Sequence, residues 1–368
     1  MNGVTGRMGY RQHLVRSILA IRDEGGVALP DGTRVVPEPV LVGRDASKLE
    51  ALAAKHGLER WTTDLDEALA TCDVYFDSQV TQAREKAIKS ALAAGKHVYT
   101  EKPLAETHAG ALELANLASQ AGVRHGVVQD KLFLPGLLKL HRLLEGGFFG
   151  RVLSIRGEFG YWVFEGDWQD AQRPSWNYRA EDGGGITLDM FCHWSYVLEQ
   201  LFAPVSAVTA VTATHIPTRW DAGAEYPATA DDAAYGIFEL TNGVIAQINS
   251  SWATRVNRDE LVEFQVDGVE GSAVAGLHHC RIQHRAATPK PSWDPDAPTT
   301  ERFRAQWQDV PDNGVLENGF KVQWAAFLRH VCADAPFPHD FYAGARGVAL
   351  AEAGLRSAAQ RRRVVLDA

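Results

Sequence analysis

The segment Glu101-Lys102-Pro103 places an ionisable lysine directly after a predicted strand at residues 98–99. Ligands of open α/β folds bind at the carboxyl ends of the strands, so this lysine is expected at a ligand site. Pro103 stiffens the loop, and a cis bond before it would aim the lysine. A lysine beside another positive charge has a depressed pKa and suits proton transfer. A lone lysine is usually a solvated surface group, but the flanking sequence AAGKHVYTEKPLA favours a chemical role.

Three glycines near the start of the chain are spaced for a phosphate-binding turn. They follow the pattern G-x-x-G-x-x-G at Gly3, Gly6 and Gly9, ahead of a helical pattern of apolar residues. Glycines let a backbone turn tightly against a pyrophosphate, and a helix N-terminus supplies free N–H groups. We therefore expect Gly3, Gly6, Arg7 and Met8 to bind a dinucleotide. The spacing differs from G-x-G-x-x-G, so a structural glycine-rich turn is an equal alternative.

Such a turn should follow a strand, yet only Met1 and Asn2 precede it. In a doubly wound sheet that strand is central. We therefore expect the natural start to lie about six to ten residues upstream, the length of an ordinary strand.

The end of the second predicted strand, Leu41-Val42, bears on the choice of cofactor. An acidic residue normally stands there to accept the ribose 2′-hydroxyl, but this chain has Gly43 followed by Arg44. Losing the carboxylate removes repulsion from a 2′-phosphate, and an arginine can pair with one. Alternatively, Arg44 faces solvent while Asp45 caps the next helix. NAD and NADP both remain open, with a slight preference for NADP.

Short apolar runs alternate with helical patterns through the first third of the chain. This alternation predicts right-handed crossovers and a parallel sheet, here a doubly wound Rossmann domain over residues 1–131. A small hairpin is expected around Asp31-Gly32. The strands are expected at 40–42, 74–76, 98–99 and 126–128, and the helices at 46–56, 83–94 and 109–121.

The pattern changes after Gly150 to strands with period-two alternation. We expect a second, α+β domain over residues 132–368, with an open-faced, mainly antiparallel sheet and C-terminal helices that can pack back on the first domain. Thr241-Asn242-Gly243 predicts a hairpin. The strands are expected at 152–161, 205–214, 233–240, 244–252, 261–266 and 273–276, the helices at 132–145, 186–201, 319–333 and 344–360, and a proline-rich surface loop at 289–298.

Three segments of the chain resemble one known family. ALAAGKHVYTEKPLAET around Lys102, GGGITLDMFCH at residues 183–193, and Phe148-Phe149-Gly150-Arg151-Val152 are similar to signatures of the Gfo/Idh/MocA oxidoreductases, named for glucose–fructose oxidoreductase and inositol dehydrogenase. The matches span most of the chain. The EKP and DxxxH signatures are informative because they occur together and in order.

The resemblance implies roles for three residues. Lys102 would hydrogen-bond the reacting hydroxyl, His193 would be the main acid and base, and Asp189 would hold the substrate or bias the histidine. A four-residue separation puts Asp189 and His193 on one helix face. The alternative is a buried helix pair satisfied internally, but the glycines at 183–185 leave room for a substrate to approach.

The chain departs from the family pattern on the cofactor side. Ser78 and Gln79 stand where the family often has Thr-Pro, and we keep them with Glu101 and Lys102 as candidate cofactor contacts. A frequent arginine after the sixth strand is replaced by Lys131, which can still reach a substrate oxygen.

Aromatic and polar residues before the DxxxH helix suit a carbohydrate substrate. Sugars present an apolar ring face and a rim of hydroxyls, which flat aromatics and amide or guanidinium donors match. We expect Arg173, Trp176, Asn177 and Arg179 to line the substrate pocket, and the arginines would also hold an anionic group. Several nearby tryptophans are expected to be core residues instead.

Composition excludes several other classes of protein. The net charge of −9 and the lack of a long basic stretch argue against nucleic-acid binding. No apolar run is long enough to span a membrane, and no secretory signal is visible. The four cysteines form no CxxC pair, so neither a metal site nor a disulfide framework is predicted, and a cytoplasmic location fits best.

The sequence therefore predicts an NAD(P)-dependent oxidoreductase that moves hydride to or from a hydroxyl-bearing carbon of a sugar, polyol or glycoside. One alternative is a glycoside hydrolase of the same fold, using transient oxidation, elimination, hydration and re-reduction. Another is a non-catalytic nucleotide-binding protein. The glycine spacing also resembles dihydrodipicolinate reductase, which the chain length and EKP segment disfavour. A homodimer or homotetramer is expected, because an open sheet face must be covered.

Overall fold

The structure is a computed structural model that describes residues 1–256, 258–290, 294, 296, 302–312 and 314–366. The chain divides into two compact units. Unit 1 contains residues 1–133, 179–196 and 317–352, and unit 2 contains residues 134–178, 197–316 and 353–368. Most of the expected loop at 289–298 lies outside the described residues.

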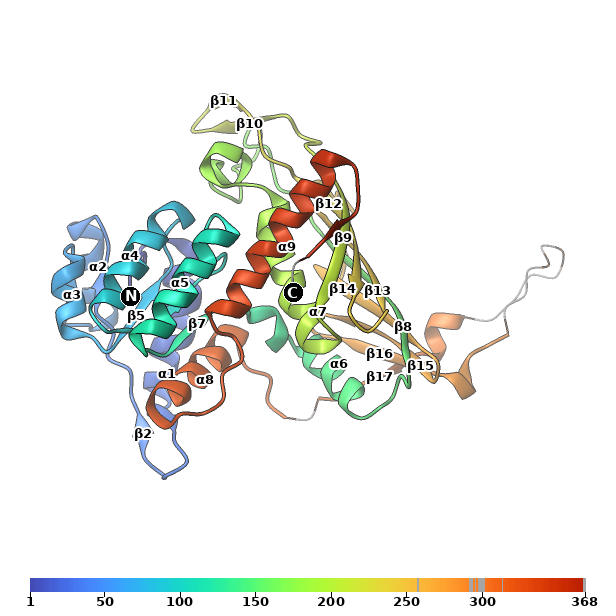
Figure 1. The fold of residues 1–368 in the computed structure, drawn as a ribbon, viewed down its shortest axis with the longest axis horizontal. Helices are drawn as coiled ribbons and strands as arrows, with labels where there is room; N and C mark the ends of the chain where they lie inside the picture. Colours follow the sequence, from blue (N-terminus) through green and yellow to red (C-terminus); the bar gives the residue numbers. More distant parts are fainter. Residues whose placement is uncertain (257, 291–293, 295, 297–301, 313, 367–368) are drawn as a thin grey trace. The chain divides into compact units, whose positions relative to one another are not determined.

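Unit 1 is built on parallel strands (Figure 1). Its strands are β3 (Leu41–Val42), β4 (Trp61–Thr62), β5 (Val74–Asp77), β6 (His97–Thr100) and β7 (His125–Val127). Asn2 forms parallel bridges to both Val42 and Asp77, and so joins the pair β3–β4 to the strands β5–β6–β7. The resulting order is the doubly wound Rossmann arrangement, whose direction switches at Asn2.

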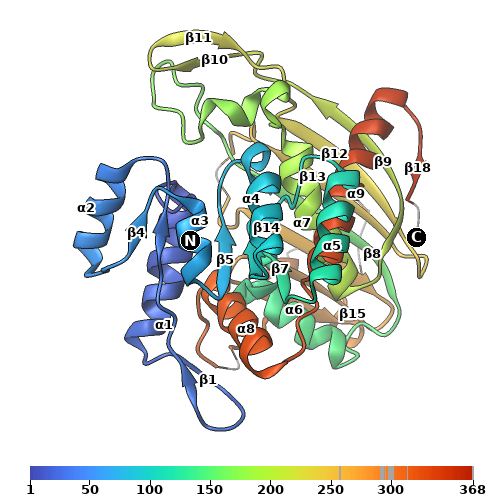
Figure 2. The ribbon, with the colours of Figure 1, turned by 60° about the vertical axis from the view of Figure 1, so that its left-hand side comes forward.

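Capping side chains explain where the helices of unit 1 begin. Asp45 accepts the N–H of Lys48 at the start of α2 (Ala46–His56), and Thr107 accepts that of Gly110 at α5 (His108–Ala121). Both helices end at a glycine in the left-handed conformation. Helices α4 (Thr81–Ala93) and α5 lie side by side (Figure 2). The sequence did not predict three short elements of this unit, β4, α3 (Leu65–Thr71) and the 3-10 helix η4 (Ala180–Asp182).

The glycine turn leads into an unusual helix. Residues Gly9–Leu19 form a π-helix, η1, which continues as α1 (Ala20–Asp23). Such wide turns are rare and occur frequently at functional sites. The expected hairpin around Asp31-Gly32 is present as β1 (Val27–Ala28) and β2 (Arg34–Val35).

Helix α8 (Gly319–Ala333) completes the core of unit 1, although it comes from near the end of the chain. Its Trp324 and Phe327 pack against Phe76 and Tyr99 from the sheet. These four rings bury a large apolar surface, which is the main stabilising contribution expected from such a cluster. The N-terminal part of α9 (Phe341–Gln360) also belongs to this unit.

Among the described residues, unit 2 contains a nine-stranded mixed sheet that is antiparallel except for the pair β8 (Val152–Gly160) and β13 (Ile245–Ser251). Gly243, with φ +84°, forms the expected hairpin turn between β12 and β13. Helix α6 (Pro135–Glu145) packs against β15 and β16. In spatial order the strands are β17 (Gln308–Asp309), β16 (Cys280–His284), β15 (Gly271–Gly276), β14 (Val262–Gly268), β8 (Val152–Gly160), β13 (Ile245–Ser251), β12 (Ala233–Leu240), β9 (Val205–Ala213) and β18 (Val364–Val365).

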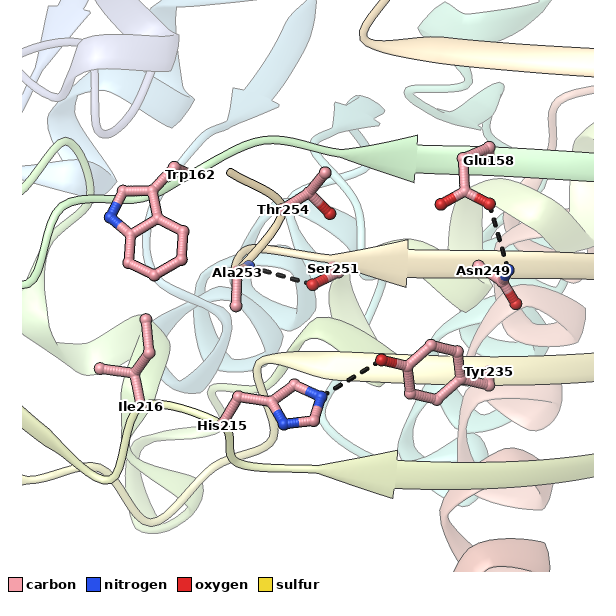
Figure 3. Close-up of a pocket in the computed structure, with 9 residues that line it drawn as sticks. All are labelled: Glu158, Trp162, His215, Ile216, Tyr235, Asn249, Ser251, Ala253 and Thr254. Carbon is pink, nitrogen blue, oxygen red and sulfur yellow. Dashed lines mark hydrogen bonds between the residues drawn. The ribbon is translucent and has the colours of Figure 1, made fainter. Parts of the chain in front are cut away.

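One face of this sheet is open, as the alternating sequence predicts. In β12 and β13 the residues Ala234, Phe238 and Ile248 are buried, whereas Tyr235 and Ile237 are exposed. The open face contains a cavity of about 420 Å³, and Glu158, Tyr235 and Asn249 project into it from adjacent strands (Figure 3). The separate hairpin of β10 (Thr218–Asp221) and β11 (Ala224–Pro227) was not expected from the sequence. Within the described residues, no helix combines the length and apolarity that crossing a bilayer requires.

Candidate active site

Lys102 and Asp189 form the centre of the candidate site in unit 1. The Lys102 ammonium donates to Oδ1 of Asp189 and to the backbone carbonyl of the same residue, at 3.1 Å for the carbonyl. Both side chains are mostly buried but keep some exposure, 16% for Lys102 and 22% for Asp189. The peptide bond between Lys102 and Pro103 is cis. The contacts of Lys102 thus join its loop to the first turn of α7 (Ile186–Leu201). A charged donor is therefore held in a fixed place beside a helix start.

His193 lies one helical turn after Asp189 on α7 and is 5% exposed. Its Nδ1 is 2.6 Å from the hydroxyl of Tyr196, which comes three residues later on the same face. The Tyr196 hydroxyl accepts the backbone N–H of Lys131 at 3.2 Å and lies 3.5 Å from Oδ1 of Asp130. The imidazole is therefore held from its Nδ1 side.

Asp130 connects the histidine to the lysine predicted as a substrate contact. Its Oδ1 lies 3.9 Å from His193 Nδ1, and its Oδ2 accepts a hydrogen bond from Lys131 Nζ at 2.7 Å. Asp130 itself is buried. The structure thus places Lys102, Asp189, His193 and Lys131 in unit 1, although they come from three separate segments. The Lys102–Asp189 pair and the contacts of His193 both involve helix α7.

The protein's own charges raise the pKa of Lys102 rather than lower it. Burial alone would lower this pKa, but the charge and hydrogen bond of Asp189, with a smaller effect of Glu101, outweigh burial. The depressed value expected from the sequence assumed a neighbouring positive ring and left out the carboxylate on α7. In the protein without a bound ring, Lys102 is therefore a charged hydrogen-bond donor.

Cys192 adjoins this pair but is not equipped as a nucleophile. It is buried, and burial raises the pKa of its thiol to about 12, despite the nearby charge of Lys102. A thiol in such surroundings is chemically inert at neutral pH.

The glycine turn has the close contacts that its residue types require. A Cβ on Gly3, whose φ is +76°, would lie 2.8 Å from the backbone of Ser78 and Gln79. A Cβ on Gly9 would lie 2.5 Å from Ser78 Oγ, so helix η1 can approach the sheet only with glycine there. Gly6 and Arg7 are exposed at the turn, and Met8 is partly exposed. This exposed backbone precedes a helix at the point where the strand order of the sheet reverses. Such a place suits the binding of a dinucleotide's phosphates.

Gly43 and Arg44, the candidate cofactor contacts after the second predicted strand, directly follow β3. Gly43 is partly exposed after β3, and Arg44 is exposed. Asp45 is the N-cap of α2, which confirms one alternative for that residue and commits its carboxylate to the helix. No acidic side chain thus stands at Gly43 itself.

Ser78 and Gln79, at the end of β5, pack against the chain's first residues. Ser78 Oγ donates to the Asn2 carbonyl at 2.9 Å, and the Asn2 amide donates to Gln79 Oε1 at 3.0 Å. The buried ion pair of Asp77 and Arg84, at 3.2 Å, supports this corner of the sheet. Both candidate cofactor contacts therefore border the glycine turn.

The candidate substrate residues are divided between the units. Arg179 belongs to unit 1, where it lies 3.9 Å from Asp182. Arg173, Trp176 and Asn177 belong to unit 2. There Arg173 donates to Asn177 at 3.3 Å and stacks over Trp252 at 4.4 Å. Among the tryptophans from 162 to 220, only Trp194 is fully buried, so fewer are core residues than expected.

Sequence reasoning missed four residues that the structure places around the site: Tyr196, Asp130, His13 and Trp324. Tyr196 had a usable signal, because it lies three residues after His193 in a predicted helix. Asp130 adjoins the predicted Lys131. His13 contacts Glu101 at 2.8 Å, and Trp324 contacts His13 at 3.0 Å, a pairing that no local pattern indicates.

Family models match both parts of the chain. Residues 30–129 match the model described as "Oxidoreductase family, NAD-binding Rossmann fold", and residues 137–274 match the Gfo/Idh/MocA C-terminal domain. A "D-xylose dehydrogenase" of Paenarthrobacter nicotinovorans is 63% identical over 371 residues, covering 99% of this chain and 96% of that protein. The chain belongs to the Gfo/Idh/MocA oxidoreductase family. This Gfo/Idh/MocA protein is therefore an oxidoreductase with an NAD-binding Rossmann domain, as the sequence predicted.

Two further comparisons found similarity at lower sequence identity. A "levoglucosan dehydrogenase" of Pseudarthrobacter phenanthrenivorans is 26% identical over 260 residues, 65% of each chain. A solved structure of levoglucosan dehydrogenase in complex with NADH and levoglucosan has a TM-score of 0.81 at 20% identity, covering 100% of this chain and 98% of that one. This second likeness supports the fold alone. The glycoside-hydrolase alternative is not favoured, since the relatives with assigned activities are dehydrogenases and reductases.

Proposed function

We propose that this protein oxidises D-xylose, or a closely similar aldopentose, with a nicotinamide dinucleotide as hydride acceptor. The observation that carries the proposal is the 63% identity, over nearly the whole of both chains, to a D-xylose dehydrogenase. The Lys102–Asp189–His193 arrangement supports it, because it offers one charged donor and one base, as alcohol oxidation requires.

In this mechanism Lys102 binds the oxygen of the reacting hydroxyl. Two of the three ammonium hydrogens are directed to Asp189, to its Oδ1 and its carbonyl, and we assign the third to the substrate. The raised pKa keeps the ammonium charged, so it stabilises negative charge as it develops on the substrate oxygen. Asp189 therefore positions Lys102 and maintains its charge.

His193 accepts the hydroxyl proton in the same step. Because Nδ1 faces Tyr196, we assign the proton transfer to Nε2. The imidazolium that forms donates from Nδ1 to the Tyr196 oxygen, while the Tyr196 hydroxyl is directed toward the buried carboxylate of Asp130. This negative charge stabilises the protonated ring. The bound cofactor supplies the acceptor for the hydride that leaves the carbinol carbon.

The test is an assay of purified protein with D-xylose, L-arabinose, D-glucose and myo-inositol. Formation of reduced cofactor is followed by absorbance, and the product is identified by NMR. We expect D-xylose to have the highest kcat/KM, and oxidation at its anomeric hydroxyl to give a lactone. If the product is a keto sugar, the oxidised carbon is another one than the anomeric carbon. No turnover of any pentose would contradict the proposal.

We further propose that NADP is accepted at least as well as NAD. Gly43 introduces no carboxylate near a 2′-phosphate, and Arg44 is exposed beside it. Asp45 uses its carboxylate to cap α2, so we do not assign it to the ribose. The ratio of kcat/KM for the two cofactors tests this, and a tenfold or larger preference for NAD would contradict it.

We also retain the proposal of a homodimer or homotetramer in which a second copy covers the open sheet face. Val211, Ile237 and Ile245 are 63%, 47% and 43% exposed on strands β9, β12 and β13, as unpartnered apolar side chains. Light scattering that shows only monomer would contradict this.

We propose a cytoplasmic location for the protein. The four cysteines are free thiols, which supports this location.

A further inference from the structure

Glu101 is bound on both of its carboxylate oxygens by the protein itself. Oε1 lies 2.8 Å from Nε2 of His13, and Oε2 accepts the backbone N–H of Lys102 at 3.1 Å. The side chain of His13 is fully buried and that of Glu101 is 9% exposed. This carboxylate therefore contacts the backbone of the lysine that the proposed mechanism uses.

The direction of these hydrogen bonds follows from Trp324. Its indole Nε1–H donates to Nδ1 of His13 at 3.0 Å, and an indole nitrogen can only donate. Nδ1 must therefore carry a lone pair, which places the ring proton on Nε2. His13 then donates to Glu101, and one tautomer is fixed by a residue 311 positions away in the chain. The rings of Phe76 and Phe320 pack against the imidazole, with centroids 4.3 and 5.1 Å from its own.

We propose that Trp324, His13 and Glu101 form a positioning chain that fixes the backbone of Lys102 and so aims its ammonium at the substrate. Trp324 donates to His13 and His13 donates to Glu101, whose second oxygen accepts the backbone N–H of Lys102 in the loop before Pro103. Glu101 thus serves as a positioning residue rather than as a cofactor contact. The inference rests on the proposed function only for its activity assays.

Charge supports the same arrangement. Burial alone would raise the pKa of Glu101, but the hydrogen bond from His13 and the nearby charges, including Lys102 and Arg84, hold the pKa below its usual value. Glu101 is therefore ionised and accepts on both oxygens. A neutral amide in its place would have to point one N–H at a donor, either His13 or the Lys102 backbone.

That conflict gives a test in which a second substitution should restore activity that the first one removes. Glu101→Gln should lower kcat about 10- to 100-fold, because a buried donor is left facing a donor. Trp324→Phe releases the tautomer of His13, whose Nε2 can then accept from the introduced amide. The double variant Glu101→Gln/Trp324→Phe should therefore be at least about tenfold more active than Glu101→Gln alone. A purely structural role predicts a double variant that is worse than either single one, and that result would overturn the proposal.

A second pair of variants tests His13 directly. Glutamine offers one donor and one acceptor in the same order, so His13→Gln should keep most of kcat, whereas His13→Leu should lose about as much as Glu101→Gln. The KM for the sugar and the cofactor should change little in all of them. Arg16→Ala, an exposed position on the same helix, is the matched control.

One readout does not depend on activity. In ¹⁵N-histidine NMR of the purified protein, the His13 signals, assigned by their loss in His13→Gln, should show a proton on Nε2 alone. In Trp324→Phe they should show a mixture of tautomers. A wild-type protein that turns over no sugar defeats the proposed function, while an Nδ1-protonated His13 defeats the positioning chain.

Discussion

The ammonium of Lys102 hydrogen-bonds both the side chain and the backbone carbonyl of Asp189, a residue 87 positions later in the chain. The carboxylate contact sets the charge of the lysine, and the carbonyl contact sets its position relative to the first turn of α7. His193 lies on that same helix, one turn further on. A change at Asp189 should therefore affect both the ionisation of Lys102 and the distance between the donor and the base.

We expect Asp189→Asn to move the alkaline limb of the activity profile to lower pH. Asp189 is the main group that raises the pKa of Lys102, so its neutralisation lets burial lower that pKa. A lysine that loses its proton at lower pH no longer supplies the charged donor. The check is kcat against pH for both proteins, and Lys102→Met should lack the limb, with kcat reduced about 10²- to 10⁴-fold. If the alkaline limb stays at the same pH in Asp189→Asn, the group that ionises there is not Lys102.

Tyr196→Phe should reduce kcat about tenfold while the KM for the sugar stays nearly constant. The substitution keeps the ring of Tyr196 but removes the oxygen that lies 2.6 Å from His193 Nδ1. The protonated imidazole then loses the acceptor that the Tyr196 oxygen provides. Tyr342→Phe serves as the control, because Tyr342 bonds Asn116 and Ser119 on α5. Equal loss in both variants would point to a general effect on stability.

Local patterns predicted the helices and strands wherever a capping residue or an alternation was present. Asp45 and Thr107 start helices within a residue of their expected positions, and Asn242-Gly243 turns the β12–β13 hairpin. The Lys102 segment was found from its place directly after a strand, and the His193 segment from its resemblance to a family signature. Two-residue strands such as β4 were missed, since so short a segment shows no periodicity.

The remaining features depend on contacts between distant segments. Nothing around Trp324 indicates that its indole meets His13, because that contact requires α8 to return to the first unit. The raised pKa of Lys102 was missed for the same reason, since the charge that causes it is on α7. Likewise, the π-helical form of η1 cannot be distinguished from an α-helix by apolar spacing alone.

Gly43→Asp should shift the cofactor preference toward NAD by about 10- to 100-fold in kcat/KM. The three atoms nearest to a Cβ at Gly43 all belong to the Leu49 side chain, at 3.4 Å or more, so the structure accommodates the substitution. The new carboxylate can accept a ribose 2′-hydroxyl and repels a 2′-phosphate. The measurement is kcat/KM with each cofactor, and Arg44→Ala is the companion that should weaken NADP alone. An unchanged ratio in both variants would place the adenosine ribose away from this loop.

Stability toward unfolding should fall as the pH is lowered from about 6.5 to 4 because of His339. Burial lowers the pKa of this histidine to about 4, and the ring contacts Gln129 Oε1 at 2.7 Å. Between these pH values the unfolded chain binds a proton that the folded protein excludes, so stability is lost as pH falls, by at most about 3 kcal/mol. Below pH 4 both states are protonated, and this contribution no longer changes. His339→Asn, whose amide can still donate to Gln129, should show a smaller loss in urea unfolding at pH 7 and 4.5. An identical pH slope in the two proteins would mean that His339 is protonated equally in both states.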